Sequence, residues 1–257
     1  MTTPILELRA INKSFGPVHV LHDMDFTVRS GEVIALVGDN GAGKSTLVKC
    51  IAGIHPADSG EVHFDGKQVH ITGPREAAEL GIEVVYQDLA LADNLDIVQN
   101  MFLGRERGHP WALDEASMEQ AARETLATLS VRTVKSVRTL VASLSGGQRQ
   151  TVAIAKSVLW DSKVVLLDEP TAALGVAQTR QVLDLVRRLA EQGLGVVLIS
   201  HNMTDVFEVS DRIATLYLGR LVADLPTVEL THSQVVELIT AGRSGDLGMA
   251  RPETATI

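Results

Sequence analysis

The sequence has little cysteine and no long apolar run. Its single cysteine, Cys50, excludes an internal disulfide and a zinc site made of several cysteines. No apolar stretch approaches the ~20 residues that a transmembrane helix needs. The first residues, 1–16, lack the basic region and the apolar segment of a secretory signal. We therefore expect the chain to fold in the cytosol.

Acidic residues outnumber basic ones. The chain of 257 residues has 23 Lys and Arg against 32 Asp and Glu, a formal net charge of −9. This balance argues against nucleic-acid binding over a broad surface, although it leaves room for a local basic pocket. Repeats and low-complexity tracts are absent, and 45% of the residues are apolar. We expect a globular protein with one large domain or two small ones.

Three short apolar runs without alternation predict parallel strands that are buried on both faces. They are Val33–Val37, Val164–Leu167 and Val196–Ile199. Apolar residues recur at helical spacing after Gly43 and again over 177–192. Strands that alternate with helices indicate an α/β fold with a parallel sheet.

Other parts of the chain depart from this pattern. Residues 5–32 and 58–72 hold short alternating segments between turn residues, which predict antiparallel hairpins. Residues 88–144 lack a convincing buried strand and predict a helical insertion, with Ser117 and Gln120 as a capping box.

A glycine-rich segment, Gly38–Ser45, follows the first predicted strand and opens a helix; we call it the phosphate loop. Its glycines allow the backbone N–H groups to converge on one point, and the helix N-terminus favours an anion there. Lys44 would reach the β- and γ-phosphates of a nucleotide, and the Ser45 hydroxyl would bind Mg²⁺. The alternative is an ordinary glycine-rich turn.

Two carboxylates end the second predicted strand. Asp168 and Glu169 would face the crevice at the carboxyl ends of the parallel strands, where ligands bind in such sheets. Asp168 would hold the magnesium shell, and Glu169 would polarise the attacking water. An ordinary strand end can have the same residues, so this interpretation depends on the phosphate loop.

A second anion cradle precedes a helix that we place at about 150–159. Its sequence is Leu144–Gln148, a hydroxyl and two glycines at a helix start. We call Ser145–Gln148 the signature segment. It has no lysine or acidic pair of its own, so it could grip phosphate without carrying out the chemistry. Such a cradle is useful if it completes the site of another molecule.

These residues resemble the ATP-binding subunits of ABC transporters, in which the pentapeptide Leu144–Gln148 is the signature motif. The resemblance covers the chain from about Ile5 to Arg243. It implies a P-loop NTPase (RecA-like) core with an antiparallel β-subdomain and an inserted α-helical subdomain. It also implies a homodimer in which two subunits meet head to tail, so that the signature segment of one covers the nucleotide held by Lys44 of the other.

The resemblance extends to single residues. Phe15 would stack on adenine, although a core phenylalanine is the alternative. Gln87 would contact magnesium and the water, although a lone Gln is usually a surface residue. His201 would contact the γ-phosphate, although a His at a strand end often bonds only to backbone. The implied catalytic residues are Glu169, His201, Gln87 and Lys44, and the implied metal ligands are Ser45, Gln87 and Asp168. The implied ATP contacts are Phe15, Gly38, Asp39, Asn40, Gly41, Ala42, Gly43, Lys44, Ser45, Thr46, Ser145, Gly146, Gly147 and Gln148.

One position departs from the family pattern. Where the family usually has an aspartate that acts across the dimer, this chain has Gly175. Coordination between the two sites of a dimer is therefore open to question. The sequence around Gly175, together with 86–91 and 199–203, resembles the ATPases of monosaccharide uptake, so we expect sugar import.

The expected organisation is one cassette over 1–242. Its core and β-subdomain comprise 1–86 and 159–242, the helical subdomain comprises 87–158, and 243–257 form a frayed tail. The partners would be membrane permease subunits and, indirectly, a substrate-binding protein, at the cytoplasmic face of the membrane and without nucleic acid. A non-sugar transporter or a soluble ABC ATPase is the alternative.

Overall fold

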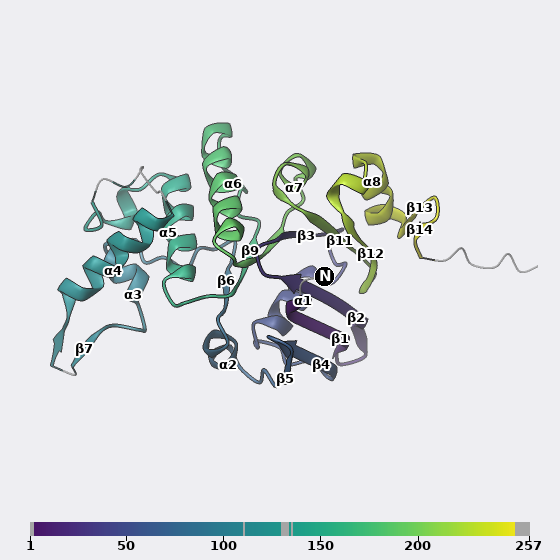
Figure 1. The fold of residues 1–257 in the computed structure, drawn as a ribbon, viewed down its shortest axis with the longest axis horizontal. Helices are drawn as coiled ribbons and strands as arrows, with labels where there is room; N and C mark the ends of the chain where they lie inside the picture. Colours follow the sequence, from purple (N-terminus) through teal and green to yellow (C-terminus); the bar gives the residue numbers. More distant parts are fainter. Residues whose placement is uncertain (1–2, 110, 130–133, 135, 250–257) are drawn as a thin grey trace, which may run out of the picture.

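A six-stranded sheet forms the centre of the fold. The computed structural model describes residues 3–109, 111–129, 134 and 136–249. The strand order is β12-β11-β3-β10-β9-β6, and all neighbours are parallel except β11 and β12 (Figure 1). The strands are β3 (Val33–Gly38), β6 (Ile82–Val85), β9 (Val164–Asp168), β10 (Gly195–Ile199), β11 (Arg212–Tyr217) and β12 (Arg220–Pro226). The three predicted strands are confirmed as β3, β9 and β10.

Helices and a second sheet cover the two faces of this sheet. On one face, alternate residues such as Ile34 and Leu36 pack against α1 (Lys44–Ile51) and the second sheet. On the other face, Val33 and Val196 pack against α6 (Val176–Glu191), while Ala35 and Val37 pack against α7 (Met203–Val209) and α8 (His232–Ala241). Because both faces are covered, the runs Val33–Val37, Val164–Leu167 and Val196–Ile199 are apolar at every position and show no alternation.

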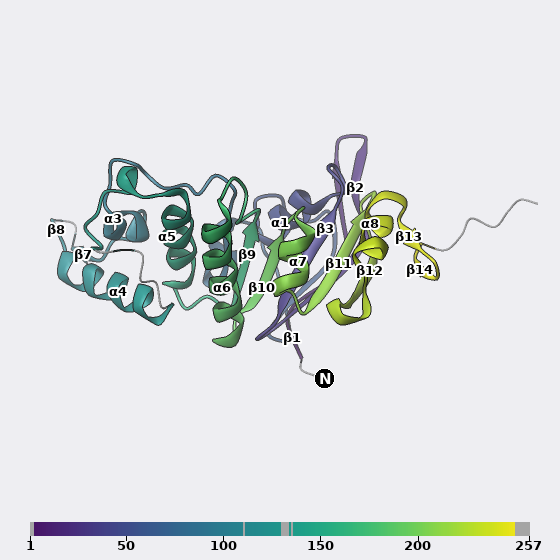
Figure 2. The same cartoon turned by 90° about the horizontal axis from the view of Figure 1, so that it is seen from above.

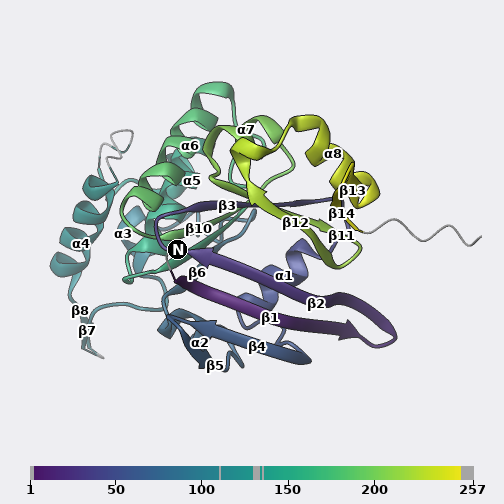
Figure 3. The same cartoon turned by 45° about the vertical axis from the view of Figure 1, so that its right-hand side comes forward.

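The second sheet is antiparallel, with the order β2-β1-β4-β5 (Figure 3). Its strands are β1 (Pro4–Phe15), β2 (Val18–Arg29), β4 (Ser59–Phe64) and β5 (Lys67–Val69). The hairpins predicted in 5–32 and 58–72 are therefore confirmed. A short helix, α2 (Pro74–Glu79), leads from this sheet to β6.

The helices of the predicted insertion, together with the helix that follows it, lie at one end of the molecule beside α6 (Figure 2). They are α3 (Ile97–Phe102), α4 (Glu115–Thr128), a 3-10 turn η1 (Val141–Ser143) and α5 (Gly146–Val158), with a small exposed hairpin of β7 (Gly108–His109) and β8 (Ala112–Leu113). The predicted helical character is confirmed. No helix in the described part of the chain has both the length and the apolar character that crossing a membrane requires.

Two predicted helix starts are wrong by one turn. The Asp114 carboxylate caps α4 by accepting a hydrogen bond from the Ser117 N–H at 3.1 Å, so Ser117 lies within the first turn and does not form a capping box with Gln120. The helix predicted from about 150 begins at Gly146, because Ser145 is its N-cap.

The predicted frayed tail is wrong for residues 243–249. After the 3-10 turn η2 (Thr227–Glu229) and α8, β13 (Arg243–Ser244) pairs with β14 (Leu247–Gly248). Ser244 is buried, and its hydroxyl donates to the Glu237 carboxylate at 2.5 Å. The rest of the predicted tail, 250–257, lies outside the described residues.

A buried arginine joins the two sheets where β3 begins. Arg212 of β11 donates to the Thr27 carbonyl of β2 at 2.6 Å, to the Glu32 carboxylate at 2.7 Å and to the Asp224 carboxylate at 2.6 Å. Its side chain is only 8% exposed. These contacts fix the second sheet against the strand that leads into the phosphate loop.

Replacing Arg212 by Ala is expected to destabilise the fold by roughly 3–5 kcal/mol, because Glu32 and Asp224 would keep their charges without this partner. Urea unfolding followed by circular dichroism measures the change. Arg180→Ala, at an exposed position of α6, is the control and should stay within about 0.5 kcal/mol of the wild type. A loss below about 1 kcal/mol for Arg212→Ala would contradict the expected role of the ion group.

Candidate nucleotide-binding site

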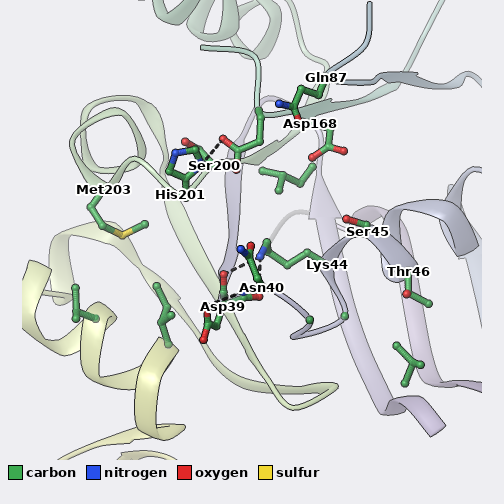
Figure 4. Close-up of a pocket in the computed structure, with 18 residues that line it drawn as sticks. Asp39, Asn40, Lys44, Ser45, Thr46, Gln87, Asp168, Ser200, His201 and Met203 are labelled. Atoms are coloured by element: carbon green, nitrogen blue, oxygen red, sulfur yellow. Dashed lines mark hydrogen bonds and ion pairs between the residues drawn. The ribbon is translucent and has the colours of Figure 1, made fainter. Parts of the chain in front are cut away.

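A cleft of about 900 Å³ lies at the carboxyl ends of β3, β9 and β10 (Figure 4). This is the edge at which open α/β sheets bind ligands. The predicted site residues that line it are Gly38, Asp39, Asn40, Gly41, Gly43, Lys44, Ser45, Thr46, Gln87, Asp168, Glu169 and His201. The fold thus gathers residues from four separate stretches of the chain at one place.

The phosphate loop needs glycine at defined points. Gly38 and Gly43 have φ angles of 157° and 106°, and a Cβ atom on Gly38 would lie 2.6 Å from the Leu216 carbonyl oxygen. No side chain caps α1, which begins directly after Gly43. The first N–H groups of this helix are therefore available to an anion in the cleft.

Lys44 is held over its own loop. Its Nζ donates to the carbonyl oxygens of Gly38 at 2.7 Å and Asp39 at 3.0 Å. Burial lowers the pKa of Lys44, and the carboxylates of Glu169, Asp39 and Asp168 oppose this shift. A half-buried ammonium whose hydrogen bonds within the described part of the chain go to neutral carbonyls is suited to pair with an incoming phosphate.

Glu169 and His201 form a pair at the centre of the cleft. Glu169 adopts a φ of 51°, which is uncommon for a residue with a side chain, and its N–H donates to the Ile199 carbonyl at 2.9 Å. Its carboxylate Oε2 lies 2.8 Å from Nδ1 of His201. The glutamate side chain is 16% exposed and the histidine side chain 77%. His201 is therefore bonded to the carboxylate and not to backbone, and a water beside Glu169 would face a base that is already oriented.

The oxygen donors for a magnesium ion lie along the same cleft. Ser45 lies in the first turn of α1, Gln87 follows β6, and Asp168 ends β9. Burial raises the pKa of Asp168, the Glu169 carboxylate raises it further, and Lys44 opposes this shift. Within the described ranges, no group of three or more His, Cys, Asp or Glu side chains is placed to hold a metal. A few oxygen donors without such a cage suit Mg²⁺ that arrives with a nucleotide, because Mg²⁺ binds through few protein oxygens and the phosphates.

Some predicted residues lie outside the lining of the cleft. Ala42 is buried within the phosphate loop. Phe15 is 43% exposed at the end of β1, where its ring meets the edge of His55 at 5.2 Å between centroids. It is therefore not the core phenylalanine that the sequence left as an alternative. The Lys13 Nζ lies over this ring, 5.6 Å from its centroid.

The signature segment forms the start of α5 and does not contribute to the cleft of its own subunit. Ser145 and Gln148 form a capping box, with the Ser145 N–H donating to the Gln148 side-chain oxygen at 2.9 Å. Gly146 and Gly147 pack against the turn before α6 and its first residues. The structure thus separates the two anion cradles within one subunit.

The sequence did not indicate one wall of the cleft. The apolar residues of this wall are Val20, Ile199, Met203, Val236 and Ile239, and Ser200 lies beside them. Met203 follows His201 closely and could have been included for that reason. Val236 and Ile239 lie on α8, and no motif links that helix to the phosphate loop.

Comparisons with a family model and with known sequences agree on one family. The ABC transporter family model matches residues 21–172. The fructose import ATP-binding protein FrcA of Rhizobium meliloti is 46% identical over 93% of this chain and 95% of its own length. The xylose/arabinose import ATP-binding protein XylG of Sulfolobus acidocaldarius is 42% identical, with 95% and 97% covered. The ribose import ATP-binding protein RbsA 2 of Escherichia coli O157:H7 is 38% identical over 96% of this chain and 48% of its own length.

Solved structures are similar over most of the chain. A nucleotide-free ATP-binding cassette from an ABC transporter has a TM-score of 0.82 and 25% identity, with 92% of this chain and 98% of that chain covered. A dimeric cassette in a post-hydrolysis state, bound to ADP and Pi, has a TM-score of 0.72 and 25% identity, with 86% and 98% covered.

Proposed function

This chain belongs to the ABC transporter family, and on that premise we propose that it is the ATP-hydrolysing subunit that powers import of a sugar through a separate permease. The observation that carries the proposal is the cleft in which the phosphate loop faces the Glu169–His201 pair. Three similar proteins are named as import ATP-binding proteins for fructose, for xylose and arabinose, and for ribose. These names support a sugar as the imported substrate.

In the proposed binding step, the phosphate loop and the N-terminus of α1 hold the phosphates of ATP. Lys44 leaves the carbonyls of Gly38 and Asp39 and pairs with the β- and γ-phosphates. Phe15 stacks on the adenine. Ser45, Gln87 and Asp168 would hold Mg²⁺, which supplies charge neutralisation at the phosphates when it is bound.

In the proposed hydrolysis step, Glu169 polarises the attacking water. His201 contacts the γ-phosphate and keeps the glutamate side chain in place through their 2.8 Å pair. Both side chains already line the cleft, so hydrolysis needs no large rearrangement within the core.

The proposed unit is a homodimer in which the signature segment of one copy covers the nucleotide of the other. Two observations support it: the signature segment does not line the cleft of its own subunit, and one of the similar cassettes is dimeric. Hydrolysis would remove the γ-phosphate that joins the two copies, and opening of the dimer would drive the permease.

The proposed location is the cytoplasmic face of the membrane. The stretch 87–158 would act as the helical subdomain that contacts the permease, and a substrate-binding protein would deliver the sugar to the permease. The net charge of −9 supports the absence of nucleic acid among the partners.

Purification of the tagged chain from membranes tests this function. We expect a permease to accompany it, and hydrolysis in proteoliposomes to rise when a sugar-loaded binding protein is added. Glu169→Gln in the same vesicles is the control and should give no uptake. A permease for amino acids or lipids would contradict sugar import, and stimulation by ribosomes or DNA would contradict transport altogether.

A further inference from the structure

The turn that follows Glu169 is attached to the cleft at its first residues. The Thr171 hydroxyl donates to the Asp205 carboxylate at 2.6 Å, and Asp205 is only 4% exposed. Asp205 lies on α7, which begins two residues after His201, the partner of the Glu169 carboxylate. The turn is thus bonded to α7, the helix that directly follows His201 of the cleft.

The far end of this turn packs against the signature segment. A Cβ atom on Gly147 would lie 3.0 Å from Cβ and 3.1 Å from Cγ of Gln178. A Cβ atom on Gly146 would lie 3.3 Å from a methyl carbon of Leu174. The starts of α5 and α6 therefore approach closely at the two glycines, where an added Cβ would force the facing side chain to shift slightly, and Figures 1 and 2 both show these helices side by side.

Gln178 also shapes the start of α6. Its side-chain oxygen accepts a hydrogen bond from the Gly175 N–H at 3.2 Å, which is the N3 half of a capping box. Gly175 has no side chain to cap the helix, so this bond is the side-chain contribution at that end. One side chain thus contacts both the turn from Glu169 and the signature segment.

We propose that Gln178 is a positioning residue that joins the signature segment to the turn after Glu169. Through Gln178, a change of nucleotide in the cleft of one subunit would move the signature segment of the same subunit, which covers the nucleotide of the second copy. The contacts Glu169–His201, Thr171–Asp205 and Gln178–Gly147 form this connection within one chain. This connection would coordinate the two sites of a dimer in a chain that has Gly175 where the family usually has an aspartate. The inference rests on the proposed function, because it requires a composite site.

Gln178→Ala is expected to lower kcat for ATP by roughly tenfold to a hundredfold, since a misplaced signature segment loses its grip on the partner's nucleotide. The affinity of the monomer for a fluorescent ATP analogue should not change, because the phosphate loop is intact. Gln178→Glu keeps Cβ, Cγ and the acceptor oxygen and should retain most of the activity. Gln181→Ala is the matched control, with the same residue type exposed on the same helix.

A second measurement distinguishes coupling from a general structural role. If the turn and Gln178 act as a unit, the effects of Thr171→Val and Gln178→Ala on kcat are not additive. If Gln178→Ala does not fold, Gln178→Leu is compared with Gln178→Glu, because leucine keeps the volume and lacks the acceptor.

Three results would overturn the inference: a kcat for Gln178→Ala within about twofold of that for Gln181→Ala, an equal loss in Gln178→Glu, or additive effects in the double variant. Failure of the proposed function would look different. In that case the wild-type rate per molecule would be independent of protein concentration.

Discussion

Glu169→Gln should bind ATP with unchanged affinity and accumulate as a dimer while losing roughly 10²–10⁴-fold in hydrolysis. The amide keeps the shape of the carboxylate, so the phosphate loop and the fold are retained. It cannot accept the proton of the attacking water, so the γ-phosphate stays between the two copies. Size exclusion in MgATP, with phosphate release as the rate assay, measures both effects.

Glu208→Gln is the matched control for this variant, because Glu208 is exposed on α7 and does not line the cleft. It should hydrolyse ATP at the wild-type rate and show no dimer accumulation. If Glu169→Gln eluted only as a monomer with ATP bound, the composite site would be contradicted even if hydrolysis were lost. If hydrolysis continued, Glu169 would not be the base.

The sequence alone was sufficient to predict the features that are formed by consecutive residues. The run Val33–Val37 is apolar at every position because both faces of β3 are covered, and this makes it recognisable without any alignment. The phosphate loop is likewise continuous in sequence, and its glycines have the backbone angles that a phosphate cradle needs. Local sequence therefore predicted the class of the fold and most of the cleft.

The failures arose where several local signals competed. At the start of α4, both Asp114 and Ser117 are good N-cap residues. Starting at Glu115 buries Met118, and this packing decides the register. In the tail, Gly245 has a φ of 58° in the turn that allows β13 and β14 to pair, whereas the position at the end of the chain suggested fraying. Tertiary contacts settled both cases, and such contacts cannot be read from a short window.

Long-range packing also hid the role of Gln178. In the sequence it is one glutamine on a polar helix face, 30 positions or so after the signature segment, with no motif of its own. Only the approach of α5 to α6 shows that Gly147 of the signature segment faces this side chain and that Gly146 faces Leu174. Close contact between helices within one subunit is therefore a second physical reason for glycine at these two positions.

Lys44→Ala should reduce ATP affinity by roughly 10²–10³-fold, because it removes two charge-assisted contacts to phosphate. The free protein should lose little stability, since Nζ bonds only to the carbonyls of Gly38 and Asp39 and burial already disfavours its charge. Isothermal titration with MgATP and a thermal melt without nucleotide separate these two quantities. Lys49→Ala is the matched control, because Lys49 lies on the same helix and does not line the cleft. An ATP affinity equal to that of the control would show that the half-buried ammonium does not contact phosphate, and the loop would then be an ordinary glycine-rich turn.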